Sequence, residues 1–158
     1  MKKQKTYKIK IIIIAVVVVF LLIIGVSYFV YNSASKNTKF ALEIADDFYT
    51  KLEAKDYLGI TSIPKTPGGP SDNETMFLLS TIDAKWGEVK SYELTNTNVW
   101  YYRDSTVITL YYNVNRTIYN SNEKLVILKE KGSNEYLIDL YAADSPEFNQ
   151  AQIFGNRT

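Results

Sequence analysis

The sequence predicts an α+β domain attached to one N-terminal membrane-spanning helix. Three observations predict this fold class: an uncharged apolar run over residues 11–30, two amphipathic helical patterns after it, and four alternating segments joined by short turns. A helical period followed by a period of two is typical of helices that pack on one face of an antiparallel sheet. We therefore expect a layer of helices against a four-stranded meander.

Residues 11–30 read IIIIAVVVVFLLIIGVSYFV and contain no charge. Twenty helical residues rise about 30 Å, which is the thickness of the hydrocarbon core of a bilayer. Five lysines lie in residues 1–10, and no acidic residue precedes residue 31. Because positive charge is retained on the cytoplasmic side, the N-terminus is expected in the cytoplasm and the C-terminal domain outside it. The sequence thus predicts a single-pass protein of the plasma membrane.

A cleaved signal peptide is the alternative interpretation of this segment, because Ser33-Ala34-Ser35 resembles a small-residue cleavage site. The apolar run is longer than the usual apolar region of about 7–15 residues, which favours an uncleaved anchor. The chain contains no cysteine, so lipid attachment at a cysteine, disulfides and thiolate metal sites are excluded.

The charge is distributed unevenly. Beyond residue 30 there are thirteen basic and seventeen acidic residues, which gives that part of the chain a formal charge of −4 although the whole chain carries +1. A negative domain lacks the basic patch that binds a phosphate backbone, so nucleic acid is not an expected partner. A cysteine-free exported domain rich in Ile, Lys, Asn and Tyr indicates a bacterial cell-envelope protein.

After a short polar linker at 31–39, a helix is expected from Phe40 to about Gly59. Its apolar side chains fall on one stripe and its charged ones on the other. The stripe consists of Ala41, Ile44, Ala45, Phe48 and Leu52. Residues 60–73 hold three prolines and two glycines and predict an irregular loop. A second helix should begin at Ser71, which has capping-box spacing to Glu74, and end before Gly87.

Alternating segments then predict four antiparallel strands with short connections. They cover residues 89–102, 106–119, 123–131 and 135–143. In the fourth strand, alternation places Ile138 and Leu140 on the core face and Asp139 and Tyr141 on the other. The tail at 144–158 is expected to contain a short helix started by Ser145-Pro146-Glu147.

Three stretches resemble the nuclear-transport-factor-2-like (NTF2-like) superfamily. They are ALEIADDFYTKLEAKDYLG, IDAKWGEVKSYEL and LYYNVNRTIYNSNEKLVILKEKGSNEYLIDLYA, and the resemblance covers about residues 40–143. More narrowly, the chain is similar to small membrane-anchored bacterial members of unknown function. The resemblance implies a cone of helices packed on a curved sheet, with a cystatin-like arrangement as the alternative. This fold hosts enzymes, binding modules and assembly subunits, so it does not define a function.

Histidine is absent as well as cysteine, which excludes the commonest general base and the usual zinc ligands. Asn120-Ser121-Asn122-Glu123 lacks the glycine of a calcium loop, and Pro67-Gly68-Gly69-Pro70 does not join a strand to a helix as a phosphate loop does. No catalytic, cofactor-binding or metal site is therefore predicted. Some enzymes of the superfamily pair an Asp base with a Tyr donor, for which the candidates would be Asp46, Asp47, Asp83 and Asp139 with Tyr92, Tyr112 and Tyr141.

Arg116 shares the core-facing parity of Val114 and Ile118. A buried guanidinium needs a carboxylate or an anionic ligand, so Arg116 marks either a buried ion pair or a pocket. The alternative, which the sequence favours, is that Arg116 lies near the strand end and extends to water.

Tyr111, Tyr119 and Tyr141 have the opposite parity and could form an exposed tyrosine surface on the sheet. The expected function is therefore a membrane-anchored interaction or assembly domain that binds other envelope proteins or itself, for instance in a secretion or conjugation machine. A small-ligand-binding or sensing domain that uses the cone is the alternative, and a lyase or isomerase is less favoured. A filled cone supports the first function, and a cavity between the helices and the sheet supports the second.

Overall fold

The computed structural model describes the backbone of residues 2–145 and 148–152, and the side-chain surroundings of residues 16–28 and 31–144. It has three helices and five strands within those residues. The helices are α1 (Lys2–Glu53), α2 (Tyr57–Thr61) and α3 (Asp72–Trp86). The strands are β1 (Val89–Tyr101), β2 (Ser105–Arg116), β3 (Ser121–Glu130), β4 (Leu137–Ser145) and β5 (Phe148–Gln152).

The chain divides into two units, residues 1–37 and residues 38–158. The first unit is the N-terminal part of α1. Among the described residues, α1 is the one helix apolar enough to cross a membrane, with a mean hydropathy of 2.2 over its best window and none of that window buried. Residues 31–39, expected as a linker, are helical, so the helix expected to begin at Phe40 is the C-terminal part of α1.

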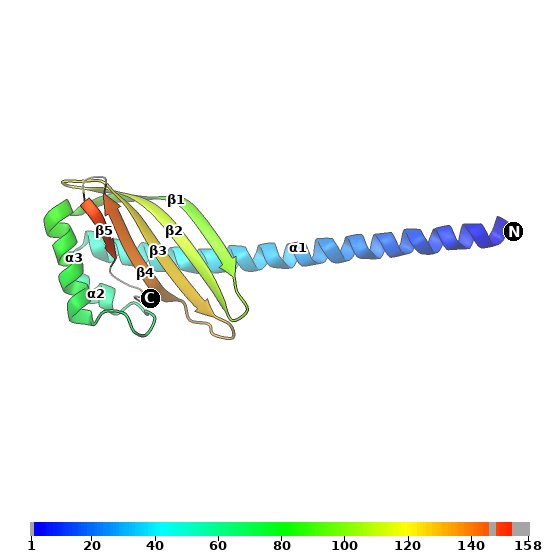
Figure 1. Cartoon of the computed structure of the whole chain (residues 1–158), viewed down its shortest axis with the longest axis horizontal. Coiled ribbons are helices and arrows are strands. Elements are labelled where there is room, and N and C mark those ends of the chain that lie inside the picture. The colour runs from blue at the N-terminus through cyan, green and yellow to red at the C-terminus, as the bar shows by residue number, and fades with distance from the viewer. Residues whose placement is uncertain (1, 146–147, 153–158) are drawn as a thin grey trace. The chain divides into compact units, whose positions relative to one another are not determined.

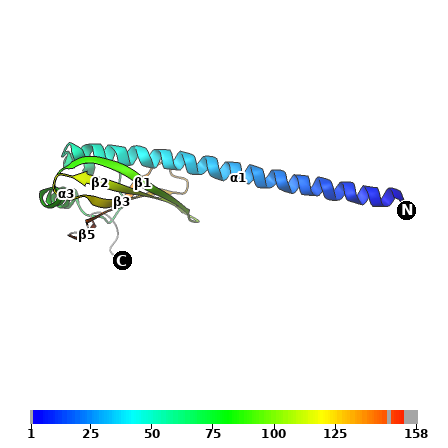
Figure 2. The same ribbon diagram turned by 90° about the horizontal axis from the view of Figure 1, so that it is seen from above.

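The second unit is an α+β domain, and its strands form one antiparallel sheet in the order β1-β2-β3-β4-β5. Figure 1 shows the sheet as a curved layer crossed by the C-terminal part of α1, and Figure 2 shows that part of α1 on one side of the sheet. The meander of four long strands was predicted. The expected short helix in the tail is wrong, because residues 148–152 form β5, which pairs with β4; residues 146–147 and 153–158 lie outside the described residues.

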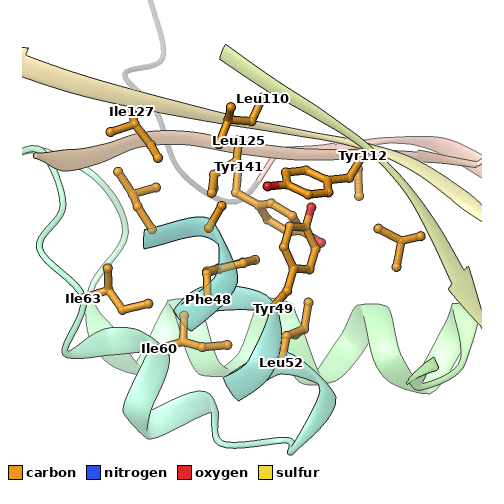
Figure 3. Close-up of a cluster of buried hydrophobic side chains, with 14 of the residues drawn as sticks. Phe48, Tyr49, Leu52, Ile60, Ile63, Leu110, Tyr112, Leu125, Ile127 and Tyr141 are labelled. Carbon is orange, nitrogen blue, oxygen red and sulfur yellow. The ribbon is translucent and has the colours of Figure 1, made fainter. Parts of the chain in front are cut away.

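The core lies between this sheet face and the helices. Phe48, Tyr49 and Leu52 of α1 point toward Leu125 of β3 and Tyr141 of β4 in Figure 3, and all five are at most 1% exposed. Further aromatic contacts tie α1 to the sheet, including Tyr49 with Tyr112 at 4.6 Å between ring centroids. The space between helices and sheet is thus occupied by packed side chains.

Local signals position α3 as predicted. Ser71 caps its N-terminus through the reciprocal capping box with Glu74, and Gly87 ends it at a φ of 87°, where a side chain would be strained. The helix expected to run to about Gly59 ends at Glu53, and Tyr57–Thr61 form the separate helix α2, so the loop expected at 60–73 begins within α2. Its remainder is held against β4: the Thr66 N–H donates to the Ile138 carbonyl at 3.0 Å and the Ile138 N–H donates to the Pro64 carbonyl at 2.8 Å.

Candidate functional site

The face of the sheet turned away from the helices carries rows of apolar side chains. The register aligns Val107 of β2 with Leu128 of β3 and Leu137 of β4, and all three are half-buried. Alternation places them opposite the fully buried Ile108 and Ile127, which face the helices. We call this the helix-free face.

The next aligned row on this face contains Thr109 of β2, Val126 of β3 and Leu140 of β4, and its two apolar side chains are half-buried. The next row on the same face contains Tyr111 and Lys124. Apolar character therefore continues across β2, β3 and β4 and gives way to polar side chains toward the β2–β3 turn.

Two neighbouring hollows occupy the polar half of this face. Their volumes are about 580 Å³ and 430 Å³, and they share Asn113 and Asn122. The first also includes Ser91, Glu93, Asn115 and Asn120, and the second includes Asn96, Tyr111, Lys124 and Asp144. The lining offers amide and carboxylate groups beside apolar side chains such as Val114, Ala142 and Ala143, so it suits a polar ligand or the rim of a protein contact.

The predicted tyrosine surface does not form. Tyr111 lies on the helix-free face and is half-buried. Tyr119 follows the end of β2 and packs partly against the core, with its N–H donating to the Trp86 carbonyl at 3.0 Å. Tyr141 is wholly buried on the helix side. The prediction that these three tyrosines share one exposed face is therefore wrong.

A β-bulge in β4 explains the position of Tyr141. Ile127 is paired with Ile138, but Val126 is paired with Leu140, so Asp139 is an extra residue in β4. One extra residue reverses the alternation beyond it, which turns Tyr141 into the core and Leu140 onto the helix-free face. Asp139 accepts a hydrogen bond from the Thr66 hydroxyl at 3.0 Å, so the loop before α3 holds the bulge in place.

Arg116 is 3% exposed and lies in a network of buried polar groups. Its Nη1 donates to Asp83 of α3 at 2.7 Å, and its Nη2 and Nε donate to Glu123 of β3 at 2.8 and 3.1 Å. The other carboxylate oxygens are also bonded, since Tyr141 donates to Glu123 at 2.6 Å and Tyr57 donates to Asp83 at 2.5 Å. The favoured expectation that Arg116 extends to water is wrong; the structure places it in the buried ion pair.

The network is built for stability of the fold. Desolvation alone would lower the pKa of the Arg116 guanidinium, but Tyr141 and the Glu123 and Asp83 carboxylates outweigh it, and the pKa is raised. The cation joins α3 to the β2–β3 hairpin. Since both carboxylates are buried and hydrogen-bonded, the network offers no open oxygen that a substrate could reach.

Sequence reasoning missed both partners of Arg116, although a signal existed for each. Glu123 has the same alternation parity as Leu125 and Ile127, which points it into the core. Asp83 follows Leu79 by four residues and therefore lies on the buried side of α3.

The remaining Asp–Tyr candidates do not meet in a cavity. Asp46 accepts a hydrogen bond from Tyr92 at 2.7 Å at the protein surface, and Asp47 pairs with Lys51. Burial raises the pKa of Tyr112 to about 12 and the pKa values of Tyr49 and Tyr141 well above the ordinary tyrosine value. These hydroxyls are therefore weak general acids. Over the described residues, no group of three acidic side chains is placed to hold a metal ion.

Comparisons of this chain with protein-family models, with curated proteins and with solved structures find no match.

Proposed function

We propose that the protein is a membrane-anchored component of the bacterial cell envelope whose exported domain binds another protein, a second copy included, through its helix-free face. The apolar segment of α1 supplies the anchor, with the N-terminus in the cytoplasm. Secretion and conjugation machines contain accessory subunits of this layout, with a short basic tail, one span and one small domain.

The observation that carries the proposal is the pair of aligned apolar rows on the helix-free face. Val107, Leu128 and Leu137 form one row and Val126 and Leu140 belong to the other, although α1 and its core contacts lie on the opposite face. Apolar area that none of the described elements covers marks an interaction surface, because covering it gains about 25 cal/mol per Å². The polar hollows beside the rows would form the hydrated rim of that contact.

The arrangement of the domain is compatible with the resemblance to the NTF2-like superfamily, since helical segments precede a long-stranded meander. A cystatin-like arrangement remains the alternative. The packed core supports an interaction role over the cone-pocket alternative, although a hollow of about 330 Å³ lies beside α1, lined by Ile44, Ile63 and Tyr136 among others. The buried, saturated Arg116 network gives no support to a lyase or isomerase. A non-enzymatic role is therefore proposed.

Binding of a small polar ligand in the two hollows is the second candidate. It is favoured by the five asparagines in their combined lining, which are Asn96, Asn113, Asn115, Asn120 and Asn122. Such a ligand would be bound on the outside of the sheet and not inside the cone.

Position-specific photo-crosslinking in native membranes tests the proposal. A photoreactive phenylalanine at Tyr111 or Leu128 should give a discrete adduct of fixed mass, because both positions lie on the helix-free face. The same residue at Lys85, which is exposed on α3, is the control and should give none. Equal adducts from all three positions, or no adduct from any position, would contradict a protein contact at this face. If no adduct forms and a polar solute raises the Tm of the chain, the ligand candidate is favoured.

A further inference from the structure

The exported domain carries its chain entry and two hairpin turns at one end. Phe40, near the start of the domain, packs on Tyr136 beside the β3–β4 turn with 5.4 Å between ring centroids. In that turn the Lys131 N–H donates to the carbonyl of Asp104 in the β1–β2 turn at 2.9 Å. The two turns lie side by side in Figure 1. We call this region the hairpin end.

Three consecutive aromatic residues are exposed at the hairpin end. Trp100, Tyr101 and Tyr102 are 59%, 50% and 63% exposed. Because Trp100 and Tyr101 are neighbours in β1, their side chains point to opposite faces of the sheet. The aromatic groups therefore surround the tip of the hairpin and are not confined to one face.

The length of the connection limits how far the hairpin end can lie from a membrane. The apolar segment ends at Val30 and the domain begins at Thr38, so residues 31–37 connect them. Seven residues span about 11 Å as a helix and at most about 25 Å when extended. The headgroup layer adds about 5–8 Å outside the hydrocarbon core. If the apolar segment spans the bilayer and residues 31–37 are helical, as they are in α1, the chain entry lies only about 3–6 Å beyond the outer headgroup layer, and at most about 20 Å beyond it when they are extended.

We propose that the hairpin end rests on the outer surface of the same membrane, with Trp100, Tyr101 and Tyr102 in the headgroup layer. This inference rests on the membrane anchoring proposed above. Trp and Tyr favour this layer because the ring is apolar and the N–H or O–H reaches water. A partner protein lying flat on one face would contact only one of the two strand aromatics, whereas a headgroup layer surrounds the tip.

Charge at the hairpin end is balanced. Arg103 and Lys131 are accompanied in the same turns by Asp104 and Glu130, all four exposed. The contact should therefore depend on the aromatic side chains and be nearly independent of anionic lipid, in contrast to a polybasic membrane-binding surface.

The two tryptophans of the chain provide the test. Trp86 is 3% exposed in the core, whereas Trp100 is at the hairpin end. The full chain is reconstituted into phosphatidylcholine vesicles that contain a lipid with a nitroxide quencher in its headgroup. The tryptophan emission of the wild-type chain should be at shorter wavelength in the vesicles than in detergent, and the labelled lipid should quench it. Trp100→Phe, which retains only Trp86, should lose both effects.

Flotation of the vesicles separates the two proposals. A chain that does not float with the vesicles contradicts the membrane anchor itself. A chain that floats but is quenched no more than Trp100→Phe overturns the contact of the hairpin end alone. Protection of Trp100 from a water-soluble quencher without quenching by the labelled lipid would also overturn it, because it would assign the tip to a contact between copies. Quenching that appears only with anionic lipid would contradict the aromatic basis of the contact.

Discussion

Replacing Arg116 by methionine should destabilise the domain strongly, because two carboxylates would lose their buried cation. Glu123 and Asp83 are 1% and 8% exposed, and the guanidinium donates hydrogen bonds to both at 2.8 and 2.7 Å. Methionine fills a similar length of space but donates no hydrogen bond. The substitution therefore isolates the lost charge and hydrogen bonds from the loss of packing.

The size of the effect follows from the burial of the network. Removing one partner of a buried ion pair costs about 3–5 kcal/mol. A domain of this size loses about 3–5 °C in Tm per kcal/mol, so the expected decrease is about 9–25 °C. Tyr141 and Tyr57 still donate to the carboxylates in the variant, which places the expectation toward the lower end of that range.

The assay is a thermal melt of the full chain in detergent, followed by near-ultraviolet circular dichroism, which reports the tyrosine-rich core. Lys51→Met is the matched control, since Lys51 pairs with Asp47 on the surface of α1 and such a helical pair contributes about 0.2–0.5 kcal/mol. Replacing Arg116, Glu123 and Asp83 together by apolar residues should recover much of the loss, because no buried charge remains. An Arg116→Met melt within the change caused by Lys51→Met would refute the account of the network.

Other substitutions and pH test separate parts of the fold. Gly87→Ala should lower the free energy of unfolding in urea several times more than Gly132→Ala. Both glycines have a positive φ, at which a side chain costs about 1–2 kcal/mol, but only at Gly87 would the added carbon collide with the turn after β2. Ser71→Ala should cost about 1 kcal/mol by loss of the α3 cap, and Ser80→Ala in the helix interior much less; equal losses would contradict the capping box. Because burial raises the pKa of Tyr112 to about 12, its contribution is complete below the ordinary tyrosine pKa of about 10 and is lost as pH rises through 12; stability in a pH series that does not fall over this range would contradict its burial.

The C-terminal part of α1, α3 and the four long strands could be predicted because each depends on a local signal, whereas α2 and β5 were not predicted. The stripe from Ala41 to Leu52, the capping box at Ser71 and the glycine at position 87 define the helices without knowledge of the tertiary structure. Alternation and short turns likewise predicted the order of the four long strands.

The predictions of the interaction surface were wrong because they depended on register. The bulge at Asp139 is stabilised by Thr66, which lies 73 residues away in the chain, and it alone decides that Tyr141 is buried. Likewise, whether Arg116 reaches water depends on Asp83 and Glu123, which only the assembled fold brings to it. Alternation within one strand predicts neither the bulge nor the partners of Arg116.

The most direct test of the central claim is the size of the complex extracted from native membranes with a mild detergent. Val126→Lys places a charge in the second apolar row, at a half-buried position where a lysine can still reach water. If the helix-free face binds a protein, the wild-type chain migrates in a complex of defined size, and Val126→Lys, with its thermal melt unchanged, migrates as the single chain. Co-migration of the folded variant with the wild-type complex would contradict the claim.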